Sequence, residues 1–383
     1  MTINNEHKKL NAPNLRFPEF QGEWEEYKLE DITAEIGDGI HATPIYDDNG
    51  TFYFVNGNNI SEYGITITAT TQKVTAEEAL RNNASALNSY SILLSINGTI
   101  GNVALYKNEP IMLGKSACYI NVSSNINRNY IFYYLMMPKC QFYFTSELTG
   151  TTIKNLSLKS VRKTKVLLPN ANEQSKIARL FDAINERIAT QNKIIDKLQS
   201  LIKGIRNDVY GKLRKSVGVN AMISDVLSYE QPQPYIVKDT EYTAEGIPVL
   251  TANKAFVLGY TSETDGIYDK GDCIIFDDFT LDCKYVDFPF KVKSSAIKIL
   301  TAKNKELLRY TFEFLKYLDL STEEHKRHYI AETQNQEFIL PTEQIVKTIA
   351  HIFSTLSVRM ETAVKQRNVF EKQKQYLLRQ MFI

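Results

Sequence analysis

Two stretches of the chain carry apolar residues at alternating spacings of three and four, which is typical of helices that pack along a single seam. In the first stretch, roughly 172 to 215, the seam positions are Ile177, Phe181, Ile184, Ile188, Ile195, Leu198 and Ile202. In the second, within 341–383, they are Ile349, Phe353, Leu356, Met360, Phe370 and Leu377. Arg367 and Lys374 interrupt the second seam. We expect two long helices, the first of about 40 residues and roughly 60 Å at 1.5 Å per residue.

The two helical stretches belong to an internal repeat with one fixed offset in sequence number. This offset places the Leu-Pro pair 168–169 on the Leu-Pro pair 340–341, and Phe181 on Phe353. Proline favours the first turn of a helix, so each helix should begin shortly after its Leu-Pro pair. Two such seams in one chain pack most simply as an antiparallel pair. The alternative is that each helix packs only on its own domain.

The regions before the two helices show the same order of strand and helix patterns. TFYFVNGNNI is matched by IPVLTANKAF, SILLSINGTIG by CIIFDDFT, SACYINV by SAIKIL, and NYIFYYLM by LRYTFEFLKYL. We predict an α+β fold, with two similar mixed α/β domains separated by two long antiparallel coiled-coil helices as a pseudo-two-fold repeat. The expected boundaries are 1–168 for the first domain, 169–215 for the first helix, 216–340 for the second domain and 341–383 for the second helix.

The composition is that of a folded protein, and the charge is locally uneven. Formal net charge is only +1, so any contact with nucleic acid must be local. Residues 169–215 carry ten basic and five acidic side chains, whereas 220–340 carry thirteen basic and twenty acidic ones. The four cysteines are far apart and lack zinc-site spacing, and no apolar run approaches the roughly 20 residues that cross a bilayer. We expect reduced thiols, no membrane contact and a cytoplasmic location.

Motifs for catalysis are missing from the sequence. The nearest phosphate-loop candidate, Gly114-Lys115-Ser116, has Glu109 where the motif needs glycine. No nucleophile elbow, zinc-protease motif or Asn/Asp-Pro-Pro-Tyr methyltransferase motif occurs. The segment EEHKRHY is better explained as a solvated helix end than as a metal site. We therefore expect a non-enzymatic chain with no metal or cofactor of its own.

Polar loops that follow the expected strands are the candidates for DNA contact. Asn, Thr, His, Lys and Arg side chains suit base edges and phosphates, although each loop alone could be an ordinary turn. The acidic surplus of the second domain then either faces away from DNA or reads cytosine amino groups through Asp side chains. The candidates are His41, Thr43, Asn58, Asn59, Asn97, Thr99, Thr151, Thr152, Lys154 and Asn155 in the first domain, and Asn253, Lys254, Lys284, Lys326, Arg327 and His328 in the second.

The segment LPNANEQSKIARLFDAINERIATQNKIIDKLQ resembles the spacer helix of type I restriction-modification specificity subunits, in which Leu-Pro, Glu-Gln and Ala-x-x-Phe open a coiled-coil arm. PEFQGEWEEYKLEDI, GDGIHATPIYDDNG and SILLSINGTIG resemble the domain entrance, early loop and central strand of that family. The second repeat departs from the pattern, because its Glu-Gln pair lies two places nearer the proline and DDFTLD replaces Gly-Thr-Ile-Gly. These departures put the ideal helix contact and the shape of that loop in question.

The resemblance implies that each domain binds one half of a bipartite double-stranded DNA target. The helices would set the spacer and dock two modification subunits, which would bring S-adenosylmethionine, and restriction subunits using ATP and Mg would join the complex. The main alternative is a duplicated protein-interaction scaffold that never contacts DNA. An enzyme with an unusual site is a further alternative, which the empty motif search disfavours.

Overall fold

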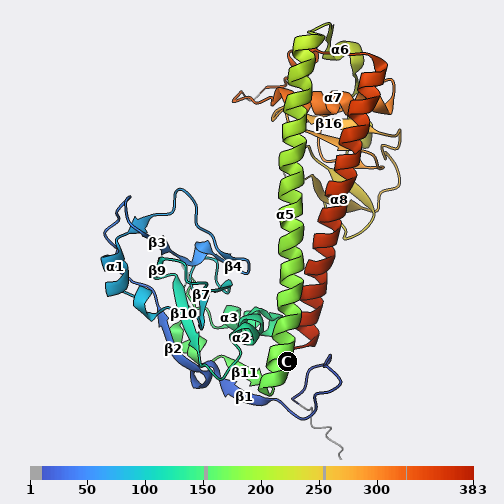
Figure 1. Ribbon diagram of the computed structural model, residues 1–383. Helices are drawn as coiled ribbons and strands as arrows, with labels where there is room; N and C mark the ends of the chain where they lie inside the picture. Colours follow the sequence, from blue (N-terminus) through green and yellow to red (C-terminus); the bar gives the residue numbers. More distant parts are fainter. Residues whose placement is uncertain (1–10, 151–153, 253–255, 325) are drawn as a thin grey trace, which may run out of the picture. The chain divides into compact units, whose positions relative to one another are not determined.

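The computed structural model describes residues 11–150, 154–252, 256–324 and 326–383 (Figure 1). The chain forms two compact units, one of residues 1–192 with 366–383 and one of residues 193–365. Each unit therefore contains one half of each long helix. Among the described residues, no helix combines the length and the apolar composition needed to span a membrane.

The first unit is built on a four-stranded antiparallel sheet in the order β2-β10-β7-β8. The bounds of these strands are Thr33–Asp38, Ala117–Val122, Ser91–Ser95 and Val103–Leu105. A smaller sheet has the order β6-β3-β9, with bounds Lys73–Val74, Phe52–Val55 and Ile111–Leu113. Further elements are β1 (Glu25–Lys28) paired with β11 (Lys165–Leu168), the hairpin β4 (Ile60–Ser61) and β5 (Gly64–Ile65), and helices α1 (Ala76–Arg81), α2 (Arg128–Met136), α3 (Pro138–Ser146) and α4 (Leu158–Arg162).

The central strands of this sheet are buried throughout and mostly apolar because both faces of the sheet are covered. Every residue of β7 and β10 is buried. On one face, Ile92 and Ile120 pack in a core shared with α2 and the long helix α5. On the other, Leu93 packs with residues of β3 and β9. A continuous apolar run is the pattern expected of a strand buried on both faces.

Within the described residues, the second unit repeats the order of the main and the smaller sheet, without a counterpart of the β4–β5 hairpin. Its main sheet has the order β13-β19-β16-β17, with bounds Ser228–Glu230, Ile297–Thr301, Cys273–Asp277 and Cys283–Val286. The smaller sheet has the order β15-β14-β18, with bounds Val257–Thr261, Ile247–Leu250 and Lys291–Val292, and β14 pairs with β18 in parallel, as β3 does with β9. The remaining elements are β12 (Ala221–Met222) paired with β20 (Glu337–Phe338), α6 (Ile223–Val226) and α7 (Lys305–Leu318). The predicted pseudo-two-fold repeat of mixed α/β domains is confirmed.

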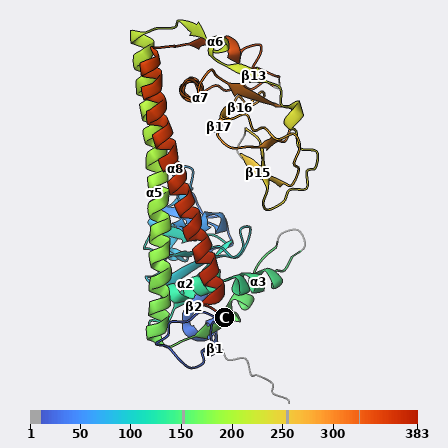
Figure 2. The same ribbon diagram turned by 90° about the vertical axis from the view of Figure 1, so that its right-hand side faces the viewer.

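The two long helices are α5 (Ala171–Ser216) and α8 (Glu343–Gln380). In the first unit the start of α5 packs with the end of α8, where Phe181 and Phe382 rings lie 5.6 Å apart. In the second unit the end of α5 shares a core with the start of α8, including Tyr210 and Phe353. The green and red helices lie side by side within each unit in both views (Figures 1 and 2). The predicted antiparallel pairing is confirmed.

Burial along the helices follows the expected seam. Buried seam residues are Ile177, Phe181, Ile184, Ile188, Ile195, Ile349, Phe353, Leu356 and Leu377, and Leu198, Ile202, Met360 and Phe370 are half-buried. Lys374 differs from the expectation that it interrupts the seam, since its side chain is only 3% exposed. Its ammonium lies 2.6 Å from the carboxylate of Glu62, which follows β4. The seam continues through Lys374 because the first domain supplies its counter-charge.

The Glu-Gln pair at the start of α5 has a structural role that the second repeat lacks. Asn170 caps the helix by accepting a hydrogen bond from the Glu173 amide at 3.0 Å. The Glu173 side chain is fully buried, and both of its oxygens accept 2.7 Å bonds from Arg16. Gln174 is also buried. In α8, Glu343 is exposed and pairs with Lys347, so the shifted position changes what the residue contacts.

Candidate nucleic-acid interface

Loops that are distant in sequence meet at one end of the main sheet of the first unit. We call this set, 39–43, 56–59, 95–99, 114–116 and the described part of 149–155, the first loop cluster. The backbone amide of Gly57 donates to Ser116 Oγ at 2.8 Å, and Thr99 Oγ1 donates to the Gly57 carbonyl at 2.8 Å. Asn97 and Asn155 form a β-bridge, and residue 40 bridges to residue 114. The structure thus brings together four of the loops that the sequence indicated.

Glycine is required at position 57 by this close approach of loops. An added Cβ would lie 2.2 Å from Ser95 Oγ and 2.8 Å from the Ser116 carbonyl oxygen. No side chain tolerates contacts that short. The GNN segment therefore serves first to hold the loops together.

The candidate side chains of the first domain differ in what they contact. His41, Thr43, Asn58, Thr99 and Lys154 are exposed, and Asn97 and Asn155 are half-buried. Thr151 and Thr152 lie outside the described residues.

Three of these candidates already have partners for their side chains, one being Thr99, whose hydroxyl donates to the Gly57 carbonyl. The ring of His41 lies 2.8 Å from the Asp38 carboxylate. Asn59 uses both ends of its amide within the loop, accepting from the Asn56 amide and donating to the Thr66 carbonyl, each at 3.0 Å. Asn59 therefore shapes the cluster more than it offers groups to a ligand.

Lys115 is a residue that sequence reasoning considered only as part of a failed phosphate loop. It is exposed between the buried strands β9 and β10, within the first loop cluster. The feature of the sequence that could have pointed to Lys115 is its position in a short turn between two mostly apolar strands. Gly114 beside it is fixed by the approach of Asn56, whose Oδ1 would lie 2.3 Å from an added Cβ.

The second unit forms an equivalent arrangement, which we call the second loop cluster, from residues 277–282, 293–296 and 326–329. The Asp278 amide donates to the Ala296 carbonyl at 2.8 Å, and the His328 amide donates to the Asp278 carbonyl at 3.0 Å. Arg327 is exposed, with its guanidinium 6.0 Å from the ring of Phe279. Phe279, which the sequence analysis missed, is 38% exposed in the turn between β16 and β17.

The structure corrects one candidate and restricts two others in this domain. His328 was wrong as a side chain available to DNA, because its ring is buried and lies 2.9 Å from Glu332. Lys284 is half-buried and pairs with Asp282 at 3.3 Å. Lys326 is exposed but bridges Glu332 and a second carboxylate. Asn253 and Lys254 lie outside the described residues.

The titration of His328 follows from its contacts. The hydrogen bond with Glu332 is the largest influence and raises the pKa of His328. The pKa of Glu332 is correspondingly lowered, chiefly by Lys326 and then by His328. The contact of the His328 ring with the Glu332 carboxylate supports the loop from inside.

The acidic residues of the DDFTLD turn are used within the protein. Asp277 Oδ1 accepts bonds from the amides of Phe279 and Thr280, at 3.0 and 2.9 Å. Asp278 is buried, accepts from the Tyr329 amide at 2.7 Å and lies 3.5 Å from the Lys298 ammonium. These two carboxylates are therefore not placed to accept from cytosine amino groups.

The turn itself differs from its counterpart in the first domain, as its sequence suggested. Leu281 adopts a left-handed φ of 61°, whereas glycines 98 and 101 take positive φ in the β7–β8 turn.

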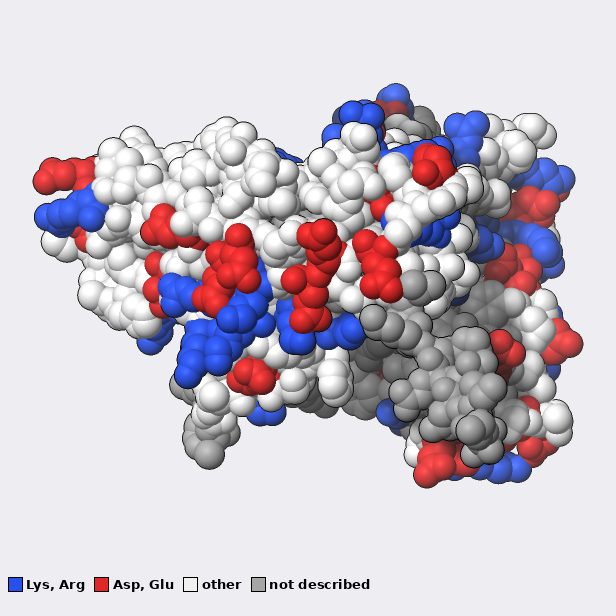
Figure 3. Space-filling view, turned by 90° about the horizontal axis from the view of Figure 1, so that it is seen from below, with Lys and Arg blue, Asp and Glu red and all other residues white. Residues whose placement is uncertain are grey.

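Basic and acidic side chains are mixed on the face of the molecule that Figure 3 shows. Figure 3 shows Lys and Arg side chains interspersed with Asp and Glu over the face in view. Any electrostatic attraction to DNA must arise in small regions.

No enzyme-like cluster accompanies these loops in the described part of the chain. Groups of three or more His, Cys, Asp or Glu that could hold a metal do not occur there. All four cysteines are buried and unpaired, and burial raises the pKa of the Cys283 thiol to about 11. They remain protonated and form part of the cores.

Comparison with known proteins shows what the first repeat is similar to. The family model described as type I restriction modification DNA specificity domain matches residues 21–200, slightly under half of the chain. The matched residues include the first loop cluster and the first part of α5, as the resemblance in the sequence implied.

Two related proteins extend the comparison. A stretch of 126 residues is 45% identical to the Escherichia coli type I restriction enzyme EcoR124I/EcoR124II specificity subunit, covering 31% of this chain and 31% of that protein. The match thus spans about a third of the length of this curated relative. The crystal structure of the type I restriction-modification S subunit from M. genitalium aligns with a TM-score of 0.66 at 16% identity, over 97% of this chain and 99% of that one. The whole chain therefore has the specificity-subunit fold, including the second repeat.

Proposed function

We propose that this chain is the DNA specificity subunit of a type I restriction-modification enzyme, in which each domain binds one half of a bipartite duplex target. The observation that carries the proposal is the duplication of one topology, with a polar loop cluster at the corresponding place in each unit. A split DNA site requires two such binding surfaces in one protein. Two acidic residues of the second cluster, Asp277 and Asp278, are buried and so do not face a bound duplex.

The chain acts in this proposal as a non-catalytic adaptor. Two modification subunits dock on the paired helices and bring S-adenosylmethionine, and restriction subunits add ATP- and Mg-dependent activity. The helices set the spacer between the half-sites. Exposed side chains of the first loop cluster, such as Asn58 and Lys115, contact bases and phosphates.

Methylation mapping tests the proposal directly. The chain is produced with its modification subunits in a host lacking other DNA methylation, and modified adenines are located across the genome. We expect one bipartite motif with a spacer of fixed length. A duplicated protein-interaction scaffold would leave the genome unmodified, and that result would refute the proposal.

A matched pair of lysine variants then tests the interface in the first domain. Lys115→Ala should weaken duplex binding for every sequence and reduce the salt dependence by about one counterion. Lys107→Ala removes an exposed lysine of the same unit outside the first loop cluster and should leave binding unchanged. Equal effects of the two substitutions would reject the first loop cluster as the DNA surface.

A further inference from the structure

Both domains dock on the helix pair through one helix in the same geometry. The ring of Tyr130 on α2 lies 5.3 Å from Phe382, and the ring of Tyr310 on α7 lies 5.2 Å from Tyr210. The repeat offset places Tyr210 on Phe382. The hydroxyls of Tyr130 and Tyr310 donate to backbone carbonyls at 2.6 and 2.7 Å, and the same offset separates these two carbonyls. α2 and α7 can therefore be compared position by position, with Tyr130 matching Tyr310.

At the contact around Tyr133 in the first unit, the negatively charged side chain belongs to the helix pair. Asp182 of α5 accepts hydrogen bonds from Asn129 at 2.9 Å and from the Tyr133 hydroxyl at 2.8 Å. Asn185 of α5 donates to the same hydroxyl at 2.9 Å. Burial, and secondarily Asp182, raises the pKa of Tyr133 far above its ordinary value, so its hydroxyl stays a donor. Leu378 of α8 is buried in the same apolar cluster as Tyr133.

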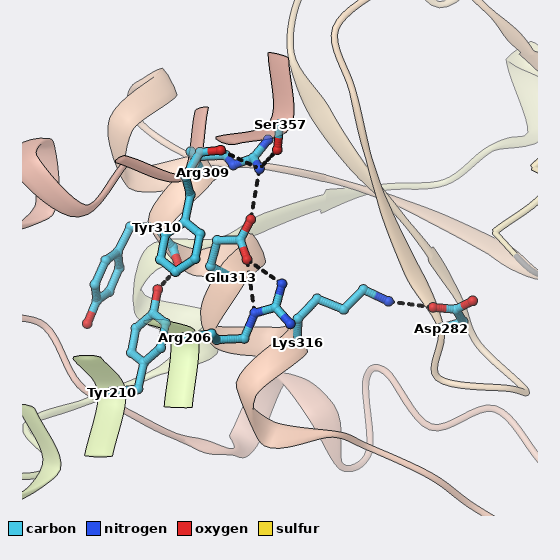
Figure 4. A network of polar contacts seen from close by, with 9 residues as sticks. Arg206, Tyr210, Asp282, Arg309, Tyr310, Glu313, Lys316 and Ser357 are labelled. Atoms are coloured by element: carbon cyan, nitrogen blue, oxygen red, sulfur yellow. Dashed lines mark hydrogen bonds and ion pairs between the residues drawn. The ribbon is translucent and has the colours of Figure 1, made fainter. Parts of the chain in front are cut away.

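At the matching contact in the second unit, the negatively charged side chain belongs to the domain and the positively charged one to the helix pair (Figure 4). The domain supplies the carboxylate, since Glu313 on α7 has a side chain only 1% exposed. Arg206 of α5 donates to one of its oxygens through Nε at 3.0 Å and Nη2 at 2.7 Å. Arg309 donates to the other oxygen at 2.8 Å and also bonds Ser357 of α8.

The reversal occurs at matching positions of the repeat. Glu313 occupies the place of Tyr133, three residues after the matched tyrosine on its helix. Arg206 and Leu378 are separated by the repeat offset and so occupy the same place on the helix pair. At these matching positions, the first end of the helix pair offers a carboxylate to neutral hydrogen-bond donors, and the second end offers a cation to a domain carboxylate. The ion pair of Lys374 with Glu62 lies at the first end as well, but at other positions.

We infer that these side chains form a docking code that lets each end of the helix pair accept only its own domain. A second-type domain placed at the first end would bury Glu313 beside Asp182, with Leu378 in place of its arginine. A first-type domain at the second end would leave Arg206 without a carboxylate. A buried charge that loses its partner is strongly unfavourable, and clashes of this kind are how proteins reject wrong partners.

The docking code reinforces the order of the two domains along the helix pair, which the short links from β11 to α5 and from β20 to α8 already set. If the chain has the proposed function, the code thereby also supports the order of the two half-sites in the target. That second statement rests on the proposed function, whereas the docking code itself concerns only the protein and is measured without DNA.

The test moves the second set of residues to the first end in the full chain. Tyr133→Glu should increase hydrogen exchange of the α2 amides by about 100-fold or more, because the new carboxylate is buried beside Asp182. Adding Leu378→Arg supplies the arginine, and adding Asp182→Ser removes the competing carboxylate, as in the second unit. The α2 amides of this triple variant should exchange at least about tenfold more slowly than those of Tyr133→Glu.

Two control variants make the result specific. Tyr133→Phe removes the hydroxyl without adding charge and should raise exchange much less than Tyr133→Glu. Leu378→Arg alone buries an arginine and should be destabilising by itself. The docking code is overturned if the triple variant exchanges as fast as Tyr133→Glu, or if Tyr133→Glu behaves like Tyr133→Phe. Loss of DNA binding in every variant, with these exchange results intact, would instead count against the proposed function.

Discussion

The buried pair of Lys374 and Glu62 predicts an unequal response to removing either partner. The Lys374 side chain is 3% exposed and the Glu62 side chain 30% exposed, with 2.6 Å between the ammonium and the carboxylate. Glu62→Gln leaves a buried ammonium without a counter-charge. Breaking a fully buried pair costs about 3–5 kcal/mol, and partial exposure of this one reduces the expected cost to about 2–3 kcal/mol.

Removing the lysine should cost far less. Lys374→Met keeps an apolar stem in the seam, and the Glu62 carboxylate can turn to water, so we expect a loss of about 1 kcal/mol or less. The double variant should resemble Lys374→Met alone, which gives a coupling energy of about 2–3 kcal/mol, equal to the cost of Glu62→Gln.

The assay is hydrogen exchange of the amides in 366–380, which reports local opening free energies without requiring the whole chain to unfold in one step. Glu371→Ala is the control, because Glu371 is 41% exposed and its contact with Tyr63 is long, at 3.5 Å. It should change stability by no more than about 0.5 kcal/mol. If Lys374→Met cost as much as Glu62→Gln, or if the two effects simply added, the reasoning about the buried ammonium would be wrong.

Three other outcomes are expected. Glu173→Gln should weaken the two-bond contact with Arg16 by about 2 kcal/mol and speed proteolysis of the segment 11–23, and unchanged cleavage would show that other contacts hold it. Because the pKa of His328 is raised by Glu332, the stabilisation from that pair is complete below the ordinary histidine pKa of about 6.5 and is lost as pH rises through the raised value. The protection factors of the amides 326–333, corrected for the intrinsic pH dependence of exchange, should fall over that range in the native chain and stay flat in His328→Asn. Gly204→Ala lies in open space on α5 and should stabilise the chain by about 0.5–1 kcal/mol in urea unfolding; a loss of stability would indicate a contact not seen here.

The elements that depend on periodicity were predictable, because spacing is visible in the sequence. The seam of α5 and the apolar centre of strand β7 follow directly from which positions are apolar. The repeat offset matched the two helices, and the shared order of strand and helix patterns matched the two domains. Contacts between distant polar residues were not predictable. Glu62 and Lys374 are 312 positions apart, and no local pattern pairs them.

The candidate site shows the same division. The loops of the first domain could be listed from the sequence because each follows a recognisable strand, and the structure brings their described parts together; whether they contact DNA stays a prediction. The direction in which a polar side chain points depends on its backbone and neighbours, which one sequence does not reveal. His328 thus appeared exposed although its ring lies inside, and Phe279 was overlooked although an apolar ring in a turn is unusual. Which of the remaining candidates contact bases stays a prediction.

The core of the first unit includes residues from the far end of the chain. Leu377, Leu378, Met381 and Phe382 pack with Phe181 and the aromatic residues of α2. During translation, the first domain therefore emerges from the ribosome long before the segment that completes its core has been synthesised. Until then the apolar stripe at the start of α5 stays uncovered, and such surfaces attract chaperones or other nascent chains. The second unit, whose residues are contiguous from 193 to 365, can close first. We therefore expect the second unit, in the middle of the chain, to fold first and the amino-terminal domain to complete its folding last.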